Sequence, residues 1–99
     1  MRIEAPRSRR LVLPLPITYR SVDDGTWLHA RIVNVSVSGV LFAPAIVETG
    51  QTIEVIFTTP VPIESIAPGK LICAAKVVRT DTAGTTAAQF DEIRFLLEA

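Results

Sequence analysis

Residues 11–20 read LVLPLPITYR, and apolar side chains recur in this stretch with a period of two. The odd positions are all apolar, namely Leu11, Leu13, Leu15, Ile17 and Tyr19. Because successive side chains of a β-strand point to opposite faces, one face of this strand is expected to be buried. Pro14 and Pro16 fall on the other face and lack backbone N–H donors, which predicts an edge strand or a partly unpaired one.

The same alternation continues along the chain between segments with turn composition. Residues 21–26 (SVDDGT) form a predicted turn whose Asp-Gly pair is a hairpin signal, and residues 59–69 carry three prolines, as expected of a long connection. Further strands are predicted at 27–35, 39–43, 52–58, 70–79 and 85–90. Five or six strands at this spacing indicate a small all-β fold, either an antiparallel barrel or a sandwich.

The last residues, 91–99 (DEIRFLLEA), change the period of the apolar pattern. Asp91 can cap a helix, and Ile93, Leu96 and Leu97 would then share one helical face. A helix of this length does not stand alone in water, so the sequence predicts a short C-terminal helix packed on the sheet.

Composition limits the class of protein. Ninety-nine residues make one small domain, and a chain that is 48% hydrophobic and 20% charged is expected to fold. A formal net charge of zero argues against a DNA or RNA partner, since broad nucleic-acid binding needs a basic surface. No apolar run approaches the length that spans a bilayer, so no membrane insertion is expected. The single cysteine, Cys73, permits no internal disulfide and fits a reducing, cytoplasmic location.

The charges are unevenly distributed. Residues 1–10 hold four arginines and one acid, whereas the rest of the chain holds six basic and nine acidic side chains. A basic arm on a mildly acidic body indicates a local anion site. The alternative is a solubilising tail with no binding role.

Residues suited to catalysis are scarce. The only histidine, His29, has no partner nearby in the sequence, and Cys73 lies within an apolar strand. One cysteine and one histidine cannot supply an ordinary structural zinc site. Asp23 and Asp24 are adjacent in a turn, where they are more suited to capping than to acid–base chemistry. The sequence therefore predicts no enzyme, no catalytic residue, no metal and no cofactor.

One polar stretch stands out, at residues 34–39 (NVSVSG). Asn34 and Ser36 are expected to share a face, and their amide and hydroxyl groups offer both donors and acceptors. Gly39 would permit a bulge or a positive φ and would let a flat ligand approach the backbone. The alternative is a polar turn that only joins two strands.

The order of these features resembles the PilZ domain, the bacterial receptor module for cyclic di-GMP. An arginine cluster (Arg7-Ser8-Arg9-Arg10) comes before Pro-x-Pro-Ile-x-Tyr-Arg, and a hairpin then leads to Asn34-x-Ser36-x-x-Gly39. Val77-Val78-Arg79 and Gln89-Phe90 follow before the chain ends. The resemblance covers nearly the whole chain and implies a six-stranded antiparallel barrel with a C-terminal helix. Residues 1–10 would be a basic arm and residues 11–99 the single barrel domain.

The family's motifs are Arg-x-x-x-Arg in the arm and Asp/Asn-x-Ser-x-x-Gly in the turn. Arg10 matches the second arginine, whereas Pro6 stands at the first, with Arg7 one residue late. A further departure is Ala87, where the family often has glycine. The family also includes adaptors that bind a partner protein and no nucleotide.

The resemblance implies a signalling receptor whose arm changes conformation on binding cyclic di-GMP and which then signals to a downstream protein. The ligand-binding residues it implies are Arg7, Arg9, Arg10, Asn34, Ser36 and Gly39. Arginine suits this ligand because its planar fork matches guanine O6 and N7 as well as phosphate oxygens. The alternative is a PilZ-like adaptor without nucleotide. A small nucleic-acid-binding barrel or an enzyme is disfavoured, since the six aromatic residues fall mostly at buried positions.

Overall fold

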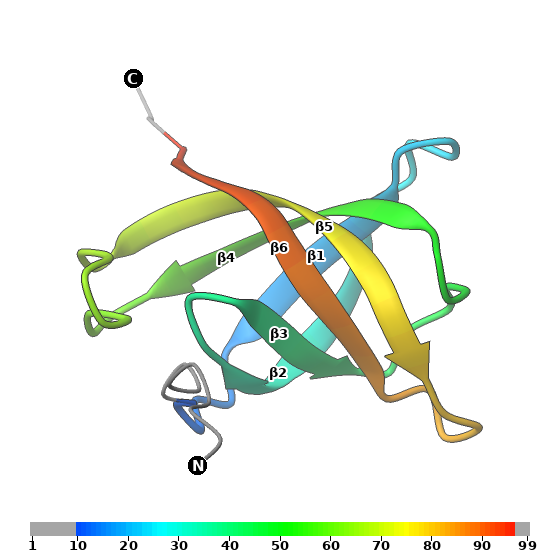
Figure 1. Ribbon diagram of the computed structural model, residues 1–99, viewed down its shortest axis with the longest axis horizontal. Helices are drawn as coiled ribbons and strands as arrows, with labels where there is room; N and C mark the ends of the chain where they lie inside the picture. Colours follow the sequence, from blue (N-terminus) through cyan, green and yellow to red (C-terminus); the bar gives the residue numbers. More distant parts are fainter. Residues whose placement is uncertain (1–9, 97–99) are drawn as a thin grey trace, which may run out of the picture.

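In the computed structural model, which describes residues 10–96, six antiparallel strands close into a barrel (Figure 1). The order around the barrel is β1-β2-β3-β6-β5-β4, and β4 pairs with β1 to complete the closure. The strands are β1 (Pro16–Ser21), β2 (Leu28–Val35), β3 (Gly39–Ala43), β4 (Thr52–Thr59), β5 (Gly69–Thr80) and β6 (Thr86–Phe95). The prediction of a six-stranded antiparallel barrel is confirmed. No helix within the described residues is long and apolar enough to cross a membrane.

The first predicted strand is shorter than its apolar pattern. β1 begins at Pro16; among the described residues before it, Leu11 forms an isolated bridge to Val35, and the Leu15 carbonyl accepts the Ile32 N–H of β2 at 2.8 Å. The Leu11 N–H donates to the Val35 carbonyl at 2.8 Å, and the Val35 N–H donates back at 3.0 Å. The intervening Pro14 has no N–H to donate, which explains the partial pairing. This bridge fixes the start of the barrel beside the end of β2.

The core lies inside the barrel and is made by the inward-facing residues of all six strands. Phe42 is completely buried, and its ring centroid lies 5.2 Å from that of Tyr19 in a tilted arrangement. Cys73 is also buried, and desolvation raises the pKa of its thiol to about 12, so the side chain stays neutral. As predicted from its apolar strand, Cys73 acts as a small hydrophobic residue.

The predicted C-terminal helix is wrong over residues 91–95. β6 continues through this segment, with Ile93 opposite Cys73 and Phe95 opposite Leu71 of β5. β5 is twelve residues long, and strand pairing along its whole length satisfies backbone groups that a helix would leave without partners. Tertiary pairing therefore outweighs the local helical pattern that Asp91 begins. Residues 97–99 lie outside the described part of the chain.

Candidate ligand-binding site

A β-bulge in β2 sets the direction of Asn34. The register with β3 shifts between Ile32 and Asn34, so that Val33 is an extra residue in β2. Ile32 and Val35 are both buried, although regular alternation would place residues three apart on opposite faces. The bulge resolves this conflict by re-aiming the chain. Asn34 consequently lies on the outside of the barrel.

Arg10 and Asn34 meet at this bulge, although 24 positions separate them in the sequence. The Arg10 guanidinium donates from Nη1 to the Asn34 Oδ1 at 2.8 Å. The bridge between Leu11 and Val35 brings the two residues together, because each is the direct neighbour of one bridge residue. The structure thus joins the last arginine of the basic arm to the first residue of the polar turn. Arg7 and Arg9 lie outside the described residues.

Ser36 has a different environment from Asn34. Its side chain is only 1% exposed, and its Oγ lies 2.9 Å from the Ser38 Oγ and accepts the Ser38 N–H at 3.2 Å. The Ser36 N–H donates to the Gly39 carbonyl at 2.9 Å and closes the turn. Local bonds of this kind shape a turn. Ser36 therefore holds the turn from inside, and its hydroxyl positions Ser38, an exposed residue of the same turn.

Gly39 is glycine for a different reason from the one expected. The bulge lies earlier, in β2, and Gly39 does not adopt a positive φ. A Cβ at this position would meet the Ala88 carbonyl oxygen of β6 inside the 3.0 Å that real Cβ atoms keep. The glycine therefore allows β3 and β6 to approach each other.

A pocket of about 220 Å³ opens where these elements meet. Its lining residues come from the arm, the turn and three strands, and are Arg10, Ser38, Gly39, Val40, Val78, Ala87, Ala88 and Gln89. The polar residues among them carry a guanidinium, a hydroxyl and an amide, and the others are small or apolar. No lining residue carries a carboxylate. This set can bind an anion and hydrogen-bond the edge of a planar ring. Ser38 and Gln89 were not predicted as site residues.

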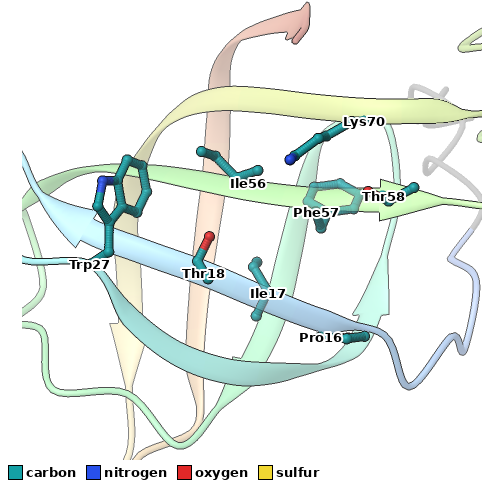
Figure 2. Close-up of a pocket in the computed structure, with 8 residues that line it drawn as sticks. All are labelled: Pro16, Ile17, Thr18, Trp27, Ile56, Phe57, Thr58 and Lys70. Atoms are coloured by element: carbon teal, nitrogen blue, oxygen red, sulfur yellow. The ribbon is translucent and has the colours of Figure 1, made fainter. Parts of the chain in front are cut away.

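A larger hollow, of about 430 Å³, lies over β1 and β4. Figure 2 shows Trp27 at one end of the hollow, Pro16 and Thr58 toward the other, and Thr18 between them. The Arg20 guanidinium lies 4.5 Å from the centroid of the Trp27 ring and pairs with Glu54 at 2.6 Å. None of the predicted site residues lines this hollow, so the Arg10 pocket is the candidate site. Within residues 10–96 no group of three or more His, Cys, Asp or Glu side chains could hold a metal ion.

Replacing Gly39 with alanine is expected to lower the free energy of unfolding by about 1–3 kcal/mol, as in other overpacked positions. The added methyl group forces β3 away from the Ala88 carbonyl and disturbs the pairing of Gly39 with Gln89. Urea denaturation followed by tryptophan fluorescence measures the loss. An unfolding free energy equal to that of the wild type would contradict the close approach of β3 and β6.

Comparisons with known proteins agree with this architecture. The family model of the PilZ domain matches residues 2–98. The inhibitor of motility of Bacillus subtilis (MotI/DgrA) has a similar structure, with a TM-score of 0.71 and 18% sequence identity. The match covers 95% of this chain and 46% of that one, so this chain spans about half the length of its structural relative.

A second similar structure is the PilZ domain of CeSA from a cellulose-synthesizing bacterium. Its TM-score is 0.65 at 15% identity, over 86% of this chain and 82% of that one. A search of curated protein sequences found no match. Since the family model covers almost the whole chain, and the barrel has the same fold as these structures, the chain belongs to the PilZ domain family.

Proposed function

We propose that this domain is a cyclic di-GMP receptor whose ligand binds in the pocket beside Arg10. The observation that carries the proposal is the hydrogen bond between Arg10 and Asn34 at the edge of that pocket. The Arg10 guanidinium donates to the Asn34 amide oxygen at 2.8 Å. A guanine base offers O6 and N7 to the same guanidinium fork, and a phosphodiester offers two oxygens.

The remaining polar groups of the pocket suit the edge of a base. The Ser38 hydroxyl and the Gln89 amide both line the pocket and both provide donors and acceptors. Gly39 and Ala87 supply a low floor on which a flat ring can lie. Under this proposal Asn34 orients Arg10 and contacts the ligand, and Ser36 supports the turn that presents Ser38.

Residues of the arm complete the proposed site. Arg7 stands in for the first arginine of the family motif, whose position Pro6 occupies, and Arg9 contacts a phosphate. Arg10 is held beside Asn34, and under this proposal the arm changes conformation when cyclic di-GMP binds. The change in the arm would then be read by a downstream partner protein.

Replacing Ser36 with alanine is expected to weaken cyclic di-GMP binding by roughly 1–2 kcal/mol at most, the contribution of one neutral hydrogen bond. The loss arises because Ser38 is no longer held by the Ser36 hydroxyl. Calorimetric titration measures it. Ser21→Ala, which removes a hydroxyl at the end of β1 that accepts the Asp23 N–H, is the matched control and is expected to bind like the wild type. Binding by Ser36→Ala that equals the control would contradict this role.

A titration followed by amide NMR signals tests where the ligand binds. Cyclic di-GMP is expected to shift the signals of Ser38, Gly39 and Gln89, which belong to the Arg10 pocket. Thr18 and Ile56 line the larger hollow near Trp27 and are expected to stay unchanged. Shifts confined to Thr18 and Ile56 would contradict the proposed site.

An adaptor that binds a partner protein and no nucleotide is the second candidate. The observation that favours it is Pro6, which removes the first arginine of the motif. Absence of any shift on addition of cyclic di-GMP would support this candidate over the receptor.

A further inference from the structure

A second β-bulge lies beside the pocket, in β5. The register with β6 shifts between Val77 and Arg79, so that Val78 is the extra residue. Val77 is buried in the core, whereas Val78 is 48% exposed. The bulge turns Val78 and Arg79 together toward the outside of the barrel. Val78 lines the pocket, and Arg79 is its direct neighbour.

The strand register places Arg79 at the end of a row of four paired residues that runs across β5, β6, β3 and β2 beside the pocket. Arg79 lies opposite Ala87 of β6, and Ala87 lies opposite Leu41 of β3. Leu41 in turn lies opposite Asn34 of β2, to which Arg10 is bonded. Neighbouring strands are about 4.8 Å apart, so the row from Asn34 to Arg79 is about 14 Å long. One arginine therefore stands at each end of the row, with the pocket between them.

Arg79 differs from the other arginines that the structure describes. Arg10 bonds to Asn34, and Arg20 and Arg94 pair with carboxylates. Arg31 donates to the Pro14 carbonyl. Arg79 has no hydrogen bond or ion pair with any residue in the range 10–96, and the pocket lining contains no carboxylate to neutralise it. An exposed guanidinium with no internal partner beside an anion-binding pocket is available to a ligand.

We propose that Arg79 is a second anion-binding residue of this site, with Val78 as an apolar contact beside the ligand base. The proposal rests on the proposed function, because it takes the ligand to be a cyclic dinucleotide with two phosphodiesters. Arg10, bonded to Asn34 of β2, engages one side of the ligand, and Arg79 engages the phosphodiester on the opposite side from β5. Arg79 belongs to neither the arginine motif of the arm nor the Asp/Asn-x-Ser-x-x-Gly motif, although Val77-Val78-Arg79 is part of the resemblance to the family. The proposed contact depends on the bulge in β5.

Calorimetric titration of Arg79→Gln with cyclic di-GMP tests this inference. Loss of a charge-assisted contact is expected to weaken binding about tenfold and to make binding less sensitive to added NaCl. Arg79→Lys is expected to recover part of the loss, since it keeps the charge without the fork. The matched control is Arg94→Gln, which removes a charge from a 62%-exposed side chain on the neighbouring strand β6, outside the pocket, and is expected to bind like the wild type.

The outcomes separate this inference from the proposed function. If the wild type binds and Arg79→Gln binds equally well with the same salt dependence, Arg79 has no role and the receptor function stands. If Arg79→Gln and Arg94→Gln lose the same affinity for cyclic di-GMP, the loss comes from the change in net charge, and the inference is overturned. If the wild type itself does not bind, the receptor function fails, and the assignment of Arg79 fails with it. A thermal unfolding midpoint for Arg79→Gln equal to that of the wild type shows that the variant is folded.

Discussion

Replacing Phe42 with alanine is expected to lower the free energy of unfolding by about 3–5 kcal/mol. Phe42 is completely buried and packs against Tyr19 across the barrel interior. Its loss removes apolar surface from the core and leaves a cavity that a closed barrel cannot readily fill. A domain of this size has roughly 5–15 kcal/mol of stability, so the variant would be close to unfolding at moderate temperature.

Phe95→Ala is the matched control, because it removes the same atoms from a ring that is 48% exposed at the end of β6. Urea denaturation of both variants measures the two losses. The loss for Phe95 is expected to be less than half of the loss for Phe42. If the two variants lose the same unfolding free energy, burial of Phe42 inside the barrel does not stabilise the fold as described.

Replacing Arg10 with alanine is expected to weaken cyclic di-GMP binding by about 1–3 kcal/mol, or roughly 5- to 150-fold. The variant loses a bidentate contact to guanine or phosphate, and Asn34 loses the guanidinium that it holds. Arg10 is exposed and contributes nothing to the core, so the unfolding free energy is expected to stay near that of the wild type. Titration calorimetry and thermal unfolding measure the two properties.

Two further variants sharpen this result. Arg10→Lys keeps the charge but lacks the planar fork, and it is expected to recover only part of the affinity. Arg94→Ala removes an exposed arginine of β6 that does not line the pocket, and it is expected to bind like the wild type. An Arg10→Ala variant that binds as tightly as Arg94→Ala would show that the ligand site lies elsewhere.

The barrel could be predicted from local sequence because a period of two and turn composition are local signals. Ile17 and Tyr19 are buried as the alternation predicts, and the prolines before them limit pairing as expected. The C-terminal segment could not be predicted in this way. Whether Ile93 belongs to a helix or a strand depends on Cys73 of β5, its partner twenty residues earlier. The pattern of neighbouring residues does not predict that pairing.

The candidate site likewise contains residues that could be predicted from the sequence and residues that could not. Arg10 and Asn34 could be singled out from motif spacing, and the structure places them in contact. Gln89 enters the pocket because it pairs with Gly39, fifty residues earlier, and this register is invisible in a single sequence. The bulges at Val33 and Val78 decide which side chains face outward. Bulges are set by the fit between strands, so they appear only once the strands are paired.

Calorimetric titration of the wild-type chain with cyclic di-GMP, with GTP as the control nucleotide, measures most directly whether this barrel is a receptor. The proposed function predicts saturable binding of cyclic di-GMP that is weakened in Arg10→Ala and is absent with GTP. No heat of binding with cyclic di-GMP, from a chain whose thermal unfolding shows that it is folded, would contradict the receptor function and leave the adaptor in its place.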